Sequence, residues 1–87
     1  MQNYPNPFNP ETNIDYELPL GSEVKIAVFN LRGQRVRTLL DAQQNPGRYT
    51  VSWDGKSDNG LSVATGVYLV RMQAGKFVSV RKILLTK

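Results

Sequence analysis

The sequence predicts an all-β protein, a small antiparallel β-sandwich of about seven strands. Three observations lead to this fold class. Apolar residues alternate with polar ones over most of the chain, turn-forming residues recur at intervals of roughly ten residues, and no stretch has a helical period long enough to cross over a parallel sheet. The 87 residues fit a single domain near the lower end of the size range that folds alone.

The chain up to Trp53 contains four expected strands. Residues 12–18 (TNIDYEL) place Ile14, Tyr16 and Leu18 on one face, and residues 23–29 (EVKIAVF) repeat the pattern. A turn at NLRGQ, in which Gly33 can take a positive φ, leads into residues 34–40 (QRVRTLL). The NPG turn then leads into residues 48–53 (RYTVSW).

Two further strands follow the turn-rich stretch DGKSDNG. Residues 66–73 (GVYLVRMQ) and 77–85 (FVSVRKILL) alternate around a short AGK turn, and a β-bulge at Arg81 and Lys82 would fit the apolar run that follows. The side chains expected in the core share the inward face of these strands: Ile14, Val24, Ile26, Val28, Tyr49, Val51, Trp53, Tyr68 and Val70.

Composition excludes several function classes. The chain has no cysteine and no histidine, so it can form neither a disulfide, nor a thiolate or imidazole metal site, nor a Ser-His or Cys-His nucleophile. No apolar run approaches the ~20 residues of a membrane-spanning helix, and the N-terminus lacks the pattern of a signal peptide. The net charge of +4 arises from scattered lysines and arginines, which the strand pattern places on solvated faces, so a nucleic-acid partner is not expected.

The N-terminal segment, residues 1–10, is expected to be a Pro-rich linker or edge strip outside the sandwich domain of residues 11–87. Proline removes a donor from the β-ladder, so this stretch cannot form a central strand. An extended polyproline-like strip with two aromatic anchors could cover a sheet edge that would otherwise template aggregation. The motif consists of Tyr4, Pro5, Asn6, Pro7, Phe8, Asn9 and Pro10.

The loop WDGKSDNG has two interpretations. Asp54, Asp58 and Asn59 lie between glycines and offer oxygen ligands of the kind that calcium prefers, but the EF-hand spacing is missing. The alternative is that the two aspartates cap turns through nearby backbone amides, with no cofactor bound. Trp53 is either a sugar-stacking platform or a core residue, and its phase with Tyr49 and Val51 favours the core.

No enzyme constellation is found elsewhere in the chain. Asp15 and Glu17 share a strand face, yet nothing in the sequence would raise the pKa of one of them, so a solvated face explains them better than a catalytic pair. The end of the chain, VRKILLTK, is either a last strand or an exposed strand that a partner could capture. In the second case deletion of Leu85, Thr86 and Lys87 should lower the melting temperature only modestly.

Three stretches together resemble a known family. YPNPFNPETNIDYELP, WDGKSDNGLSVATGVYLVRM and RKILLTK are similar, in sequence and spacing, to the type A C-terminal sorting domain of cargo proteins of the type IX secretion system. The resemblance covers the chain from Gln2 to Lys87. The stretches NLRGQRV and WDG…DNG…ATGVY also resemble the Ig-like domain of the flagellar hook-scaffold protein, which would share the fold more than the function.

The resemblance to sorting domains implies a non-catalytic, monomeric Ig-like sandwich that carries an upstream cargo protein through the periplasm and across the outer membrane to the cell surface. The partners would be the type IX secretion machinery and a surface sortase. The residues that would be recognised, carried over by position, are Gly66, Tyr68, Lys82, Ile83, Leu84, Leu85 and Lys87. Two alternatives remain open: an accessory sandwich for adhesion or carbohydrate binding, with or without calcium, and an assembly domain of the hook-scaffold kind.

Overall fold

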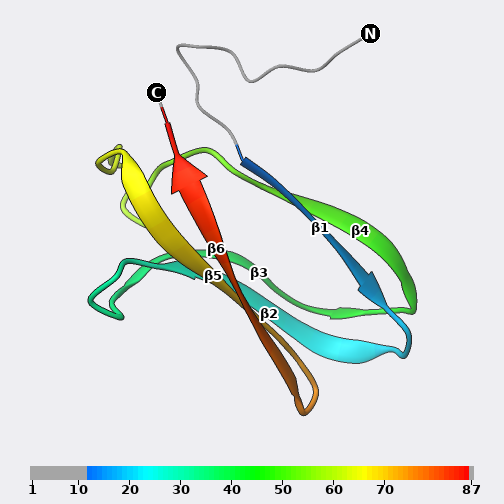
Figure 1. The fold of residues 1–87 in the computed structure, drawn as a ribbon. Coiled ribbons are helices and arrows are strands. Elements are labelled where there is room, and N and C mark those ends of the chain that lie inside the picture. Colours follow the sequence, from blue (N-terminus) through cyan, green and yellow to red (C-terminus); the bar gives the residue numbers. More distant parts are fainter. Residues whose placement is uncertain (1–11, 87) are drawn as a thin grey trace, which may run out of the picture.

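The computed structural model describes residues 12–86, which form six β-strands (Figure 1). In chain order, the strands are β1 (Thr12–Leu18), β2 (Ser22–Phe29), β3 (Arg35–Gln44), β4 (Gly47–Trp53), β5 (Gly66–Ala74) and β6 (Phe77–Leu85). The all-β sandwich is therefore confirmed, with six strands in the described residues where about seven were expected. The motif of residues 4–10 and Lys87 lie outside the described residues.

The strands form two layers. β1 and β4 pair antiparallel in a two-stranded sheet, and the second sheet has the order β3-β2-β5-β6, also antiparallel throughout. Figure 1 shows β1 and β4 lying across the four-stranded sheet, with β6 at its edge. The chain passes from the four-stranded sheet to the two-stranded sheet between β3 and β4. The turn residues Asn45 and Pro46 reverse the chain there.

Turn chemistry sets the hairpins as the sequence predicts. Gly33 has a φ of +84° in the β2–β3 turn, a conformation that side chains with a Cβ rarely adopt. The same turn is held by the Asn30 side chain, whose Oδ1 accepts hydrogen bonds from the backbone N–H groups of Arg32 (2.9 Å) and Gln34 (3.0 Å). The turn is therefore specified by a glycine and an asparagine that lie three residues apart.

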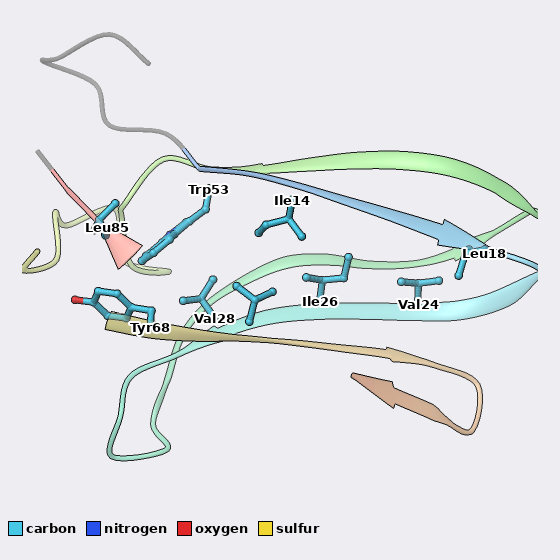
Figure 2. Close-up of a cluster of buried hydrophobic side chains, with 9 residues drawn as sticks. Ile14, Leu18, Val24, Ile26, Val28, Trp53, Tyr68 and Leu85 are labelled. Atoms are coloured by element: carbon cyan, nitrogen blue, oxygen red, sulfur yellow. The ribbon is translucent and has the colours of Figure 1, made fainter. Parts of the chain in front are cut away.

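Every strand except β3 contributes inward-facing side chains to the buried core (Figure 2). The buried cluster contains Ile14, Leu18, Val24, Ile26, Val28, Trp53, Tyr68, Val70 and Leu85. Seven of the nine core residues expected from the sequence belong to it. Tyr49 and Val51 are only half-buried against it, and Leu18 and Leu85 are core residues that the expectation omitted.

The irregularities of pairing lie between β2 and β3. The register shifts between Ile26 and Ala27 and again between Val28 and Phe29, whereas β5 and β6 pair without a shift from Gly66 to Ala74. The bulge expected at Arg81 and Lys82 is therefore wrong. The apolar run at 83–85 needs no bulge, because the sheet simply leaves Leu84 on its outer face.

Candidate functional site

An apolar band lies on the outer face of the four-stranded sheet. Since Tyr68 and Val70 point into the core, the residues between them on β5 point outward, and unshifted pairing carries this alternation to β6. The outer apolar band is formed by Phe29, Val67, Leu69, Val78, Val80 and Leu84. Three of its members are more than half exposed: Val78 (53%), Val80 (58%) and Leu84 (62%).

Cross-strand pairing makes the band continuous. Val67 lies opposite Leu84, and Phe29 lies opposite Leu69, so apolar side chains from three adjacent strands are neighbours on one face. Scattered exposed apolar residues are normal on a protein surface, but grouped ones mark contact sites. This face is the strongest candidate for a binding surface among the described residues.

Positive charges are set into the same band. The Arg71 guanidinium lies 5.0 Å from the centre of the Phe29 ring, and Lys82 lies opposite Leu69. A cation–π contact at an exposed site such as this one contributes about 0.5–1 kcal/mol. A complementary partner surface would therefore be apolar and carry carboxylates.

The residues expected at the C-terminal recognition element do not form one surface. Leu85 is 1% exposed and Tyr68 is 8% exposed, so both belong to the core, while Lys82 and Leu84 point outward. The Tyr68 hydroxyl donates a 2.6 Å hydrogen bond to the Ala64 carbonyl, and its ring meets Trp53 edge to face at 5.1 Å between centroids. The expectation that residues 85–87 can be removed at little cost to the fold is therefore wrong, because Leu85 fills the core.

Gly66 and Ile83 have structural roles in the same hairpin. Gly66 has a φ of +145° where the chain enters β5, and it pairs with Leu85. Ile83 lies opposite Tyr68 and packs half-buried against the core. The GVY and apolar C-terminal motifs thus contain residues that start a strand and fill the sandwich.

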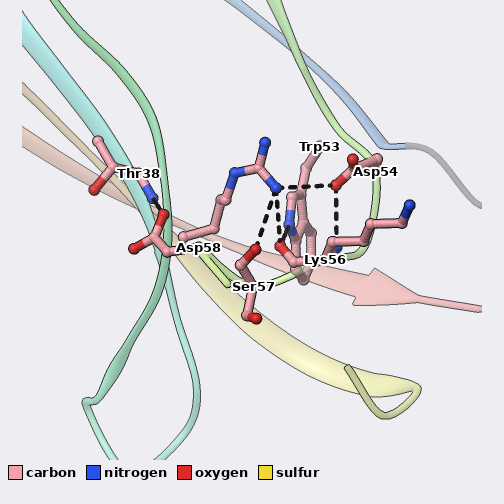
Figure 3. A network of polar contacts seen from close by, with 7 residues as sticks. Thr38, Trp53, Asp54, Lys56, Ser57 and Asp58 are labelled. Atoms are coloured by element: carbon pink, nitrogen blue, oxygen red, sulfur yellow. Dashed lines mark hydrogen bonds and ion pairs between the residues drawn. The ribbon is translucent and has the colours of Figure 1, made fainter. Parts of the chain in front are cut away.

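The 54–62 loop is tied to β3 by its aspartates (Figure 3). Asp54 Oδ1 accepts a 3.1 Å hydrogen bond from the Lys56 backbone N–H and lies 3.4 Å from Arg37 Nη1. Asp58 Oδ1 accepts a 3.0 Å hydrogen bond from the Thr38 backbone N–H. Asp58 Oδ2 also lies 3.8 Å from Arg35 Nε.

These contacts correspond to the turn-capping interpretation of the loop, extended by two arginines of β3. A calcium ion would have to compete with guanidinium groups for both carboxylates. Within residues 12–86 no cluster of three or more acidic, histidine or cysteine side chains is placed to hold a metal. Calcium binding at Asp54, Asp58 and Asn59 is a hypothesis that the melting temperature in the presence of calcium can test.

Trp53 is a core residue rather than a sugar platform. Its side chain is fully buried (0% exposed), and its indole Nε1–H donates a 2.9 Å hydrogen bond to the Lys56 carbonyl. The sugar-stacking interpretation is wrong, because no face of the ring reaches solvent. The indole N–H instead anchors the start of the 54–62 loop to the core.

The outward carboxylates of β1 are paired with β4. Asp15 Oδ1 accepts a 2.8 Å hydrogen bond from Thr50 Oγ1, and Glu17 lies 3.4 Å from Arg48 Nε. Both pairs are exposed, which agrees with the solvated-face interpretation. An exposed pair such as Glu17 and Arg48 stabilises a fold by about 0–1 kcal/mol.

The rings of Tyr16 on β1 and Tyr49 on β4 stack on each other. Their ring centroids lie 5.4 Å apart with an interplanar angle of 19°. Burial raises the pKa of Tyr16 above its usual value, and the Tyr16 hydroxyl donates a hydrogen bond to Gln44 Oε1. The phenol is therefore uncharged at neutral pH and serves as a hydrogen-bond donor.

Fold and surface together define a small Ig-like β-sandwich whose most prominent exposed feature is an apolar sheet face. The sequence model of the FlgD Ig-like domain matches residues 8–76. The chain belongs to the FlgD Ig-like domain family.

Solved structures with this fold include FlgD from P. aeruginosa, with a TM-score of 0.68 and 24% identity over 86% of this chain and 59% of that chain. FlgD from Xanthomonas campestris matches with a TM-score of 0.67 and 18% identity over 88% of this chain and 56% of that chain. The structure of that protein is described as giving insight into the hook capping essential for flagellar assembly. At these identities the likeness shows the fold. The chain spans less than two thirds of the length of either protein. No curated protein gives a match.

The family corrects the sorting-domain interpretation. The match over residues 8–76 places the chain in the FlgD Ig-like domain family, so the identification as a type IX sorting domain is wrong. The function, partners and surface localisation drawn from that identification are wrong with it. The adhesion alternative is contradicted in the same way. The physical reason is that the shared motifs contain residues that the sandwich itself requires, such as Gly66, Tyr68 and Leu85. Within residues 12–86 no helix has the length and apolar character needed to cross a bilayer.

Proposed function

We propose that this chain is a non-catalytic assembly domain of the kind found in flagellar hook-capping proteins. It contributes protein–protein contacts and carries out no chemistry. Membership of the FlgD Ig-like domain family supports the assembly role. The lack of histidine and cysteine, which removes the usual nucleophile and general-base arrangements, supports the absence of catalysis.

The outer apolar band is the contact surface in this proposal. Its exposed members Val78, Val80 and Leu84 lie on the edge strand β6, so a partner can approach them without displacing another strand. Burial of apolar area contributes roughly 25 cal/mol per Å², so each of these side chains adds about 1 kcal/mol or more when covered. Arg71 and Lys82 would orient the partner through its carboxylates.

Site-specific photo-cross-linking in cells tests this function. A photoreactive amino acid is placed at Val80 in the full-length protein, and a matched variant carries it at Arg48, which is exposed on the opposite layer. We expect Val80 to cross-link to a subunit of the flagellar hook or its cap and Arg48 to do so far less. Equal labelling at both positions, or cross-linked products that contain no flagellar subunit, would contradict the proposal.

A further inference from the structure

The strand β6 forms an open edge of the four-stranded sheet, since within residues 12–86 it pairs only with β5 (Figure 1). The Gly75 N–H donates a 3.2 Å hydrogen bond to the Glu23 carbonyl on β2. Backbone groups point to alternate sides along a strand, so those of Ala74 point toward β6. Counted along the unshifted register, every second residue of β6 from Phe77 therefore bonds to β5. The residues between them direct their N–H and C=O groups to the open edge: Val78, Val80, Lys82 and Leu84.

The opposite edge of the same sheet is closed by a loop. That edge is β3, where the Asp58 N–H donates a 2.9 Å hydrogen bond to the Val36 carbonyl. The Thr38 N–H donates a 3.0 Å hydrogen bond to Asp58 Oδ1, so the 54–62 loop satisfies two backbone groups of this strand. No hydrogen bond from the described part of the chain reaches the edge groups of β6 in this way. The sheet therefore has one covered edge and one edge open to a partner.

The strand β6 lacks most of the features that keep an edge strand from pairing. Natural edge strands are often short or contain prolines or bulges. β6 has nine residues, contains no proline and keeps an unshifted register. It also carries four of the seven large apolar side chains that are exposed within residues 12–86: Phe77, Val78, Val80 and Leu84. Three of these four also direct their backbone groups to the open edge, so a partner strand with the same two-residue period meets backbone and side chains together.

Positive charge in the middle of β6 selects the kind of partner. Arg81 and Lys82 are exposed, and neither belongs to an ion pair within the described residues. A lysine on an edge strand discourages pairing between identical chains. The antiparallel register that joins all nine residues of two β6 strands would place Arg81 opposite its own copy, and like charges directly opposite each other are destabilising. The edge therefore favours a strand from a different protein that carries carboxylates.

We propose that a partner protein adds a strand of its own to the open edge of β6, a mode of contact that rests on the assembly role proposed above. Main-chain hydrogen bonds to the four edge residues provide affinity, and the opposing side chains provide selectivity. The partner strand has apolar residues opposite Val80 and Leu84 and acidic residues opposite Arg81 and Lys82. Its apolar side chains extend the outer apolar band by one strand, and its carboxylates neutralise the two positive charges.

Amide hydrogen exchange on the full 87-residue chain tests the edge directly. The probe is the synthetic peptide VTEEVTV, which in antiparallel pairing sets valines opposite Leu84, Val80 and Val78 and glutamates opposite Lys82 and Arg81. The matched control, VTKKVTV, differs only in charge. With millimolar acidic peptide, we expect the Val80 and Lys82 amides to exchange at least about fivefold more slowly, whereas the intervening amides, which bond to β5, keep their rates. The control peptide should have no effect.

Three outcomes of this measurement would overturn the proposal. The first is that neither peptide slows exchange at Val80, and the second is that both peptides slow it equally. The third is slow exchange of the Val80 and Lys82 amides in the chain alone. If that protection does not depend on protein concentration, the chain covers its own edge, and if it grows with concentration, a second copy does.

Two variants at Val80 separate strand addition from packing against the sheet face. Val80→Pro removes the edge N–H but keeps an apolar side chain, and proline is tolerated where the N–H of an edge strand faces solvent. Val80→Ala keeps the N–H and removes most of the side chain. With a photoreactive amino acid at the exposed Leu84 position of the full-length protein, we expect Val80→Pro to lower cross-linking to flagellar hook or cap subunits at least about fivefold, and Val80→Ala to lower it much less.

The reverse order of the two variants would overturn strand addition and leave the proposed function standing. The absence of any flagellar product from the parent chain would instead refute the proposed function, while the peptide measurement decides strand addition by itself. If Val80→Pro lowers the melting temperature by more than a few degrees, peptide-dependent exchange in the unmodified chain decides.

Discussion

Replacing Leu85 and Leu84 separately by alanine should have very different effects on stability, although the two residues are neighbours near the C-terminus. Leu85 is 1% exposed and belongs to the buried cluster, whereas Leu84 is 62% exposed on the outer face. Truncation of a buried leucine costs about 2–5 kcal/mol, from lost transfer free energy and the cavity that remains. Truncation of an exposed one usually changes stability by less than about 0.5 kcal/mol.

The expected loss is large relative to the whole domain. At about 0.05–0.15 kcal/mol per residue, a chain of 87 residues has a free energy of unfolding of roughly 4–13 kcal/mol. At about 4–8 °C per kcal/mol, a loss of about 2–5 kcal/mol would lower the melting temperature of Leu85→Ala by about 8–40 °C. Leu84→Ala should melt within a few degrees of the wild type.

Urea denaturation followed by Trp53 fluorescence measures both variants, since the buried indole becomes exposed on unfolding. The slopes of the transitions should match, so that midpoints report stability alone. If Leu85→Ala lost less than about 1 kcal/mol, or if Leu84→Ala lost as much as Leu85→Ala, the placement of β6 would be wrong by one residue, because a shift by one exchanges the two faces of a strand.

Three other expectations follow from the core, the tyrosine pair and the 54–62 loop. Trp53→Ala should lower the free energy of unfolding, measured by urea denaturation, by about 3–5 kcal/mol, because it removes a fully buried indole and its hydrogen bond to Lys56. A loss under about 1 kcal/mol would contradict the burial of Trp53. Burial raises the pKa of Tyr16 in the folded state, so Tyr16 contributes its full stabilisation at pH values below the unfolded-state pKa near 10 and loses it as the pH rises through the folded-state pKa. The Tyr16→Phe variant should therefore show a smaller loss of stability at alkaline pH. An unchanged loss would refute the raised pKa of Tyr16. Millimolar calcium should leave the melting temperature unchanged, because Arg35 and Arg37 already face Asp58 and Asp54. A calcium ion bound at a hundred times its dissociation constant would raise the free energy of unfolding by about 2.7 kcal/mol. A rise of that size would show that the loop can release both arginines.

The sorting-domain interpretation failed for a reason that the structure makes concrete. The motifs that carried it were read as recognition elements, but several of their residues are required by the sandwich. Gly66 starts β5 with a positive φ, Tyr68 packs on Trp53, and Leu85 fills the core. In this chain these residues serve the fold, so the motifs report the shape of the domain more strongly than its role.

The sequence by itself determined the strands and turns, because period-2 alternation and glycine or asparagine turn chemistry act over only a few residues. Ile14, Ile26 and Tyr68 could be assigned to the core from that alternation alone, and Gly33 to its turn. Only the tertiary structure decided which of two apolar neighbours, Leu84 or Leu85, faces the core, since that depends on the register of β6 against β5. It also decided that Asp54 and Asp58 meet two arginines of β3 and that the outer apolar band is continuous across three strands. These features join residues from different strands, and which strands become neighbours depends on how the two sheets pack as well as on the local pattern of each strand and turn.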